Sequence, residues 1–150
     1  MENYKNIKIL LYGTGAVGSL YGGKLAQAGA SVSAVCRSDY KEVSAGGIFI
    51  KSVYGDYHFI PESTVHSGSE YAFEPDYVIV ATKSLPEINI ADMIRDSVHP
   101  GTAIVLLQNG IDIEPAVAEN FRNNEIISGL AFVCATWPGD GKIDHSDFGR

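Results

Sequence analysis

The stretch Ile7–Gly29, I-K-I-L-L-Y-G-T-G-A-V-G-S-L-Y-G-G-K-L-A-Q-A-G, decides the fold. The nearly continuous apolar run Ile7–Tyr12 predicts a strand buried on both faces, as in a parallel sheet. The residues from Gly13 to Gly18 fit G-x-G-x-x-G, and Ala16–Ala28 predicts a helix with Gly29 just past its end. A buried strand, a tight glycine turn and a helix N-terminus together predict a site for a dinucleotide pyrophosphate.

Each glycine of this fingerprint has its own expected task. Gly13 allows the tight turn, Gly15 lets the backbone approach the pyrophosphate, and Gly18 lets the helix pack against the strand. The competing interpretation is a chance glycine turn, but the preceding strand and the following helix favour the dinucleotide. We therefore expect the whole hexapeptide to bind the cofactor: Gly13, Thr14, Gly15, Ala16, Val17 and Gly18.

The end of the second strand, Ser31–Cys36, bears on which dinucleotide binds. Arg37 lies 19 positions after Gly18, where a guanidinium can pair with a 2′-phosphate and so favour NADP. Ser38 can add a hydroxyl to the same site. Asp39 complicates the prediction, since a carboxylate turned inward would favour NAD. The other interpretation of Arg37 is a solvated loop residue.

The rest of the chain alternates strand-like and helix-like segments, which predicts an α/β fold of the Rossmann type with a doubly wound, mostly parallel sheet. Ser84 and Glu87 match a capping box, with Pro86 in the first turn of a helix. The expected elements are a short helical piece to Ala45, a hairpin of Ile48–Val53 and Tyr57–Ile60, a loop over Pro61–Phe73, strands at Tyr77–Ala81, Ala103–Leu107 and Ile126–Val133, helices from Ser84 to about Val98 and from Asp112 or Ile113 to about Phe121, and an edge strand at Lys142–Phe148.

Two polar residues follow predicted parallel strands and are expected at the ligand-binding edge of the sheet. Lys83 follows Tyr77–Ala81, and Asn109 follows Ala103–Leu107. Lys83 can bond a ribose or phosphate oxygen, and Asn109 can donate to a substrate or nicotinamide oxygen. On position alone, a solvated lysine and an ordinary Asn-Gly turn explain them equally well.

Composition limits the partners and the compartment. The 150 residues are enough for one domain, 1–150, and the net charge of −7 argues against nucleic acid or an anionic membrane surface as partner. We expect a cytoplasmic protein, because no apolar run is long enough for a signal peptide or a membrane span. Cys36 and Cys134 are expected as small core residues. The four histidines have no metal-ligand spacing, so we expect no metal and assign them surface or structural roles.

The chain resembles the ketopantoate reductase (2-dehydropantoate 2-reductase) family. The resemblance rests on residues 13–25, Cys36-Arg37, Ala81-Thr82-Lys83 and Leu106-Leu107-Gln108-Asn109-Gly110, in this order and spacing. It implies NADPH-dependent reduction of 2-dehydropantoate, a 2-oxo acid, to (R)-pantoate in pantothenate biosynthesis. The resemblance leaves open whether the chain forms a homodimer.

The resemblance also implies roles for single residues. Gly13–Gly18 would hold the pyrophosphate and Arg37 the 2′-phosphate. Lys83 and Asn109 would contact the cofactor at the catalytic centre, with Asn109 also touching substrate. Ala135 matches a cofactor-contacting position, and His145 falls near the turn where the family's first domain closes.

The main departure from the family is length. Its members are about twice as long, and a helical second domain supplies the lysine that acts as general acid. We therefore expect this chain to be a cofactor-binding half that turns over poorly on its own. Two alternatives stay open: a related NADP-dependent 2-oxo acid or imine reductase with another substrate, and a non-catalytic NADP-binding module.

Overall fold

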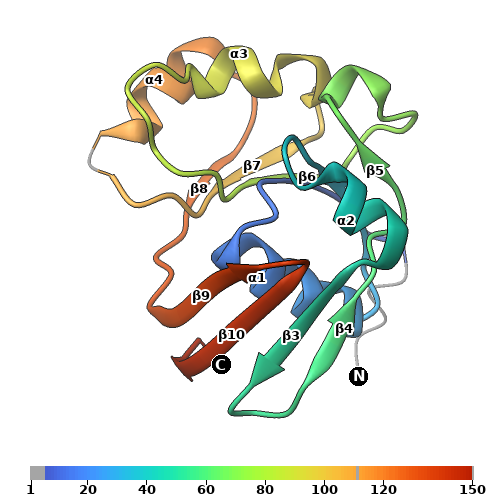
Figure 1. The fold of residues 1–150 in the computed structure, drawn as a ribbon. Coiled ribbons are helices and arrows are strands. Elements are labelled where there is room, and N and C mark those ends of the chain that lie inside the picture. Colours follow the sequence, from blue (N-terminus) through green and yellow to red (C-terminus); the bar gives the residue numbers. More distant parts are fainter. Residues whose placement is uncertain (1–5, 111, 150) are drawn as a thin grey trace.

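The computed structural model describes residues 6–110 and 112–149, which form two β-sheets with α1 between them (Figure 1). The first sheet has six strands in the order β5-β2-β1-β6-β7-β8, all parallel. The second has four in the order β4-β3-β10-β9. The strands are β1 (Lys8–Tyr12), β2 (Ser31–Val35), β3 (Ile48–Ser52), β4 (Tyr57–Phe59), β5 (Thr64–Val65), β6 (Tyr77–Val80), β7 (Ala103–Leu106), β8 (Ile126–Ser128), β9 (Val133–Gly139) and β10 (Lys142–Phe148).

The helices divide between the two faces of the first sheet. Helices α3 and α4 pack on one face, over an apolar cluster that includes Leu10, Val78 and Ile104. Helix α1 packs on the other face and also contacts the second sheet. The helices are α1 (Ala16–Gln27), α2 (Tyr40–Gly46), α3 (Ile90–Ile94) and α4 (Ile113–Asn120), with 3₁₀ turns at Gly68–Glu70 and Arg95–Ser97.

Two adjacent glycines explain how α1 fits between the sheets. A Cβ atom on Gly22 would lie 2.8 Å from Leu11 Cδ2 in the first sheet, and one on Gly23 would lie 2.6 Å from the Tyr57 ring in the second. Both positions are buried. Glycine is a weak helix former, and in this fold these two residues set how closely the two layers approach.

The predicted Rossmann-type parallel sheet is confirmed, together with the first β-α-β unit and the hairpin of β3 and β4. Gly29 ends α1 with a φ of 103°, as its sequence position predicts. The expected loop over Pro61–Phe73 is wrong in part, because Thr64–Val65 adds β5 as the edge strand beside β2.

Three other predictions are wrong. The strand Ile126–Val133 is two strands, since β8 ends at Ser128 and Val133 opens β9 in the other sheet. Lys142–Phe148 is no edge strand but lies between β3 and β9. Cys134 is exposed, because alternate residues of β9 point outward, whereas Cys36 is buried as expected.

The capping box at Ser84 and Glu87 is also wrong. The short helix α3 begins at Ile90, and the Asn89 side chain caps it by accepting a hydrogen bond from the Asp92 backbone N–H at 3.1 Å. The segment before it turns toward a cavity instead, where Leu85 and Ile88 lie in the wall.

Candidate functional site

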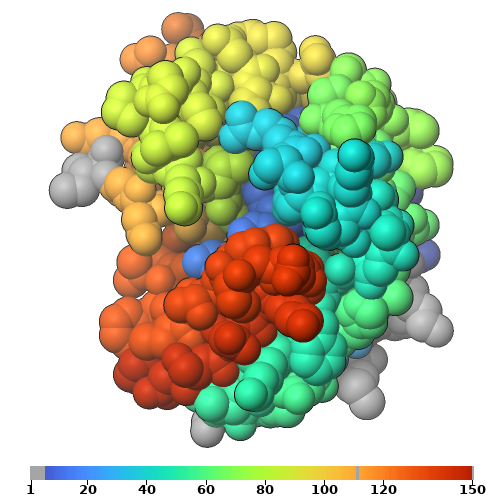
Figure 2. Space-filling view, in the orientation of Figure 1, coloured from blue at the N-terminus to red at the C-terminus, as the bar shows by residue number. Residues whose placement is uncertain are grey.

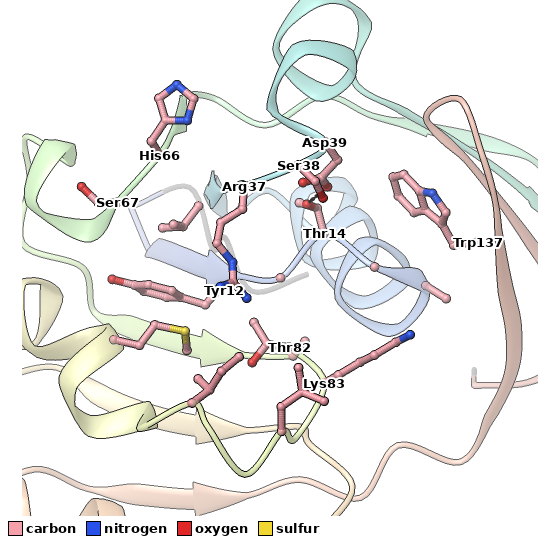
Figure 3. Close-up of a pocket in the computed structure, with 18 of the residues that line it drawn as sticks. Tyr12, Thr14, Arg37, Ser38, Asp39, His66, Ser67, Thr82, Lys83 and Trp137 are labelled. Carbon is pink, nitrogen blue, oxygen red and sulfur yellow. Dashed lines mark hydrogen bonds between the residues drawn. The ribbon is translucent and has the colours of Figure 1, made fainter.

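A cavity of about 760 Å³ opens at the carboxyl edge of the six-stranded sheet, and we call it the edge pocket (Figure 3). Its walls come from the loop between β1 and α1, the ends of β2 and β6, and strand β9 of the second sheet. Its volume lies in the range of cofactor and ligand sites. Of the predicted site residues, it brings together Gly13, Thr14, Gly15, Ala16, Arg37, Lys83 and Ala135.

The glycine loop has the geometry that the fingerprint predicts. Gly13 has a φ of 97°, and a Cβ atom there would lie 2.8 Å from the Thr82 backbone nitrogen. A Cβ atom on Gly18 would lie 1.9 Å from the Gly13 carbonyl oxygen, so only glycine lets α1 begin here. Val17 and Gly18 lie in the first turn of α1, outside the pocket wall.

Gly15 differs from the other two glycines because nothing fills the space beside it. A Cβ atom there would meet no heavy atom within 4 Å, and the residue is exposed at the mouth of the edge pocket. Gly15 is the N-cap of α1, and no side chain of the described residues caps the helix. The first-turn amide groups and the positive end of the helix dipole thus face open space that an anion can enter.

Thr14 ties the glycine loop to the end of β2. Its buried hydroxyl donates a hydrogen bond to the Asp39 carboxylate and lies 3.3 Å from Cys36 Sγ. The Asp39 side chain therefore points inward, the orientation that the sequence associates with NAD. Burial raises the pKa of Cys36 to about 11, the Thr14 hydrogen bond opposes that shift, and the Asp39 charge adds to it. The thiol stays protonated at neutral pH, so it is no nucleophile.

Arg37 and Lys83 bring positive charge to the edge pocket. Both side chains are exposed, and Figure 3 shows the Arg37 guanidinium reaching into the cavity from the end of β2. Neither forms a salt bridge with any residue that the structure describes. In a protein of net charge −7, two unpaired cations beside an uncapped helix N-terminus make a local site for an anion.

Asn109 is placed differently from Lys83. It follows β7 and is exposed, but it is not among the described residues that line the edge pocket. Its neighbour Gln108 donates two hydrogen bonds of 2.8 Å from Nε2 to Thr82, one to the carbonyl oxygen and one to the hydroxyl. The two loops that carry Lys83 and Asn109 are thus joined, as their common sheet edge predicts.

Sequence reasoning missed the part of the wall that comes from the second sheet and from the segment after β5. Thr136 and Trp137 of β9 line the edge pocket together with Ala135, and Trp137 is labelled in Figure 3. His66 also lines it, with its ring stacked on Tyr40 at 3.7 Å between centroids. No local motif marks these residues; only the alternation along β9 groups Trp137 with Ala135 on one face.

The remaining sequence expectations concern the histidines, a metal site and a membrane span. His145 is buried, and its Nδ1 lies 2.8 Å from Ser52 Oγ, which is a structural role as predicted. Within residues 6–110 and 112–149, no group of histidine, cysteine and carboxylate side chains is arranged to hold a metal ion. The same residues contain no helix long and apolar enough to cross a membrane.

Several known proteins that are similar to this chain are named 2-dehydropantoate 2-reductase. The family model described as "Ketopantoate reductase PanE/ApbA" matches residues 9–150. A protein of Nostoc sp. named 2-dehydropantoate 2-reductase is 33% identical over 143 residues, covering 95% of this chain and 44% of its own length.

Solved structures agree with these sequence matches. The 2-dehydropantoate 2-reductase of Methylococcus capsulatus superposes with a TM-score of 0.90 at 48% identity, over 95% of this chain and 46% of that one. The enzyme of Geobacter metallireducens gives 0.87 at 31% identity, over 95% and 47%. The chain therefore spans about half the length of these relatives. It belongs to the ketopantoate reductase family and corresponds to the Rossmann-type half of its members.

Proposed function

We propose that this chain is the NADP-binding half, residues 1–150, of a reductase that converts 2-dehydropantoate to (R)-pantoate with NADPH in pantothenate biosynthesis. The observation that carries the proposal is the edge pocket, where an uncapped helix N-terminus and two unpaired cations surround one cavity. Family membership supplies the reaction, since the named relatives are 2-dehydropantoate 2-reductases.

The residues present fit a phosphorylated dinucleotide. Gly13–Ala16 would hold the pyrophosphate, because the space at the Gly15 Cβ position is open and the α1 amide groups face it. Arg37, with the neighbouring Ser38 hydroxyl, would pair with the 2′-phosphate. Lys83 would neutralise phosphate or ribose oxygens from the opposite side, and Ala135 would contact the cofactor from β9.

The bound cofactor would supply a hydride to the ketone carbon of the substrate. The oxygen of that ketone then gains negative charge, which requires a proton donor or a nearby cation. Within the described residues, Lys83 is the lysine that lines the edge pocket, and we assign it electrostatic stabilisation. Asn109 would orient the substrate from the adjoining loop. The general acid would come from a lysine in the other half of the enzyme, so this chain alone would turn over poorly.

NAD is the second candidate cofactor, because the Asp39 carboxylate points toward the glycine loop. That carboxylate already accepts a hydrogen bond from Thr14, whereas the guanidinium of Arg37 has no ion-pair partner among the described residues. Pairing of the free Arg37 guanidinium with a 2′-phosphate contributes more binding free energy than a hydrogen bond from a ribose hydroxyl to the Asp39 carboxylate, which already has a partner. On this balance we favour NADP.

The chain contains one tryptophan, Trp137, and it lines the edge pocket, so quenching of its fluorescence reports cofactor binding directly. NADPH and NADH are titrated into the wild-type chain, Arg37→Ala, Asp39→Asn and the control Arg122→Ala, an exposed cation just after α4 that does not line this pocket. We expect Arg37→Ala to weaken NADPH about tenfold or more, with NADH and the control unchanged.

Equal weakening of both cofactors by Arg37→Ala, or none, would contradict the NADP assignment. Asp39→Asn separates the alternative, because selective loss of NADH affinity would assign NAD. The catalytic part of the proposal has its own assay. Reduction of 2-dehydropantoate by the 150-residue chain at a rate typical of complete enzymes would show that no second half is needed.

A further inference from the structure

The six-stranded sheet is covered to its edge on one face and only halfway on the other. The register places Leu11, Ile79, Val105 and Ile127 in one row across β1, β6, β7 and β8, on the face that α1 packs against. Leu11 is fully buried and Ile79 is 6% exposed, but Ile127 is 37% exposed. The cover over this face therefore ends beyond β6.

The opposite face shows that the exposure does not come from edge position alone. Its equivalent row is Leu10, Val78, Ile104 and Ile126. The first three are fully buried, and Ile126 packs against the same cluster under α3 and α4. On the α1 side, no helix of the described residues takes the corresponding place over β7 and β8.

A second cavity, of about 590 Å³, lies in the uncovered area between α1 and strands β6 and β7. We call it the sheet groove; its wall is apolar and includes Ile9, Leu25, Tyr77, Ile79, Val105 and Leu107. Lys24 is the one charged residue in the described wall, and its ammonium lies 4.5 Å from the centre of the Tyr57 ring. That cation contacts the second sheet, so the groove itself offers no charged partner to a ligand.

The apolar surface continues past the carboxyl end of the sheet groove. A Cβ atom on Gly129 would lie 2.4 Å from Leu107 Cδ2, so the segment joining β8 to β9 runs directly against the groove wall. The same segment carries Leu130, 93% exposed, and Phe132, 68% exposed. An apolar surface of this extent marks an interaction site.

We propose that a helix from the other half of the reductase lies in the sheet groove against Val105 and Leu107, and that its apolar face also covers Ile127 on the neighbouring strand β8. Parallel sheets are covered by helices on both faces, and a helix of about 10 Å diameter completes the missing layer. The relatives supply the chain length, since this chain covers only 44% and 46% of the Nostoc and Methylococcus proteins. A second copy fits less well, because two chains of net charge −7 repel each other.

This inference rests on family membership and on the geometry of the sheet, not on the cofactor or the reaction proposed above. It fixes how the two halves meet: α1 lines the groove with its side and the edge pocket with its N-terminus. A helix seated in the groove would therefore position the second half relative to the cofactor site.

Thiol labelling tests whether a helix covers the sheet groove. Ile127→Cys is made in a Cys134→Ser background, which leaves the buried, protonated Cys36 as the other thiol. The matched control is Ile60→Cys in the same background, at a position 66% exposed and away from the groove. Each variant is prepared as the 150-residue chain and as a fusion to the remaining part of the Methylococcus capsulatus enzyme, and its reaction with a water-soluble maleimide is timed.

We expect the thiol at position 127 to react at least about tenfold more slowly in the fusion than in the short chain, and the thiol at position 60 to react equally in both. Equal rates at position 127 would overturn the proposal. If labelling at position 127 in the short chain slows as protein concentration rises, a second copy occupies the groove and the proposal is also wrong. NADPH quenching of Trp137 in both forms tests the proposed function separately.

Discussion

The edge pocket and the sheet groove share a helix but differ in what their walls offer. The pocket wall contains an arginine, a lysine and an open glycine loop at the N-terminus of α1, whereas the groove wall is apolar along the side of the same helix (Figures 1 and 3). The first can bind a charged small molecule, and the second can bury an apolar surface. In the space-filling view, β9 and β10 lie at the front of the molecule, and a hollow opens between them, α2 and the segment that follows β6 (Figure 2).

The edge pocket and the sheet groove are encoded in the amino-acid sequence in different ways. Residue types at fixed spacing determine the edge pocket, so a short motif predicts it. The sheet groove depends on how neighbouring strands pair, and each apolar strand residue in its wall is ordinary when considered alone. The following predictions separate the two sites, beginning with a change that should remove both.

Gly18→Val should have the largest effect. A Cβ atom at this position lies 1.9 Å from the Gly13 carbonyl oxygen, and a backbone atom cannot move aside as a side chain can. We expect a loss of about 3 kcal/mol or more in the free energy of unfolding, and with it loss of cofactor binding. Urea unfolding followed by circular dichroism measures it; an unchanged midpoint would show that α1 does not depend on this contact.

Neighbouring residues of β7 test whether one sheet face lacks its cover. Ile104 is fully buried under α3 and α4, while Val105 faces the sheet groove and is only partly buried. Ile104→Ala should cost about 2–5 kcal/mol of unfolding free energy, and Val105→Ala less than about 1 kcal/mol in the 150-residue chain. Equal costs, measured by urea unfolding, would mean that the groove is already packed.

Gly15→Ala should act on the edge pocket alone. Its φ of −70° suits alanine, and the added methyl group meets no protein atom within 4 Å, so the cost in stability is limited to the poorer N-cap, about 1 kcal/mol or less. The methyl group does project into the space proposed for the pyrophosphate, and we expect NADPH affinity to fall about tenfold. Trp137 quenching measures the affinity. If this variant binds NADPH as tightly as the wild type does, the pyrophosphate does not bind beside Gly15.

The sequence predicted the structure best where contacts are local. Residues 7–36 form one β-α-β unit, and Gly13, Gly18 and Gly29 act within a few residues of their own position, so pattern and position agreed. Lys83 and Arg37 both line the edge pocket, as predicted from the rule that strand ends meet at one edge of a parallel sheet.

The prediction failed where several local signals compete or where strands far apart in sequence pair. Asn89 and Asp92 match an N-cap pattern as well as Ser84 and Glu87 do, and only the cavity wall formed by the intervening segment decides between them. The place of β10 depends on its pairing with β3, about ninety residues earlier. No local pattern contains that pairing, so residue pattern alone does not place β9 beside the edge pocket, and only the family resemblance assigned Ala135 to it.

The smallest predicted effect concerns Tyr57, which holds α1 against the second sheet and so supports the wall of both cavities. Its buried hydroxyl donates a 2.9 Å hydrogen bond to the Leu20 carbonyl oxygen. Tyr57→Phe should cost about 1 kcal/mol of unfolding free energy at neutral pH, because this hydrogen bond between α1 and the second sheet is lost. Urea unfolding of wild type and variant at pH 7 measures this cost.

The same substitution should change how stability depends on pH. Burial raises the pKa of Tyr57 from 10.0 to about 12 in the folded chain. The folded state therefore holds this proton more tightly than the unfolded state, so its contribution is complete below pH 10 and is lost as pH rises toward 12. Wild type should lose more stability than Tyr57→Phe between pH 9 and pH 11, although Cys36 titrates in both proteins. Parallel pH profiles for the two proteins would show that the Tyr57 hydroxyl is hydrated in the folded state, and hence that α1 and β4 are packed more loosely than the contact at Gly23 implies.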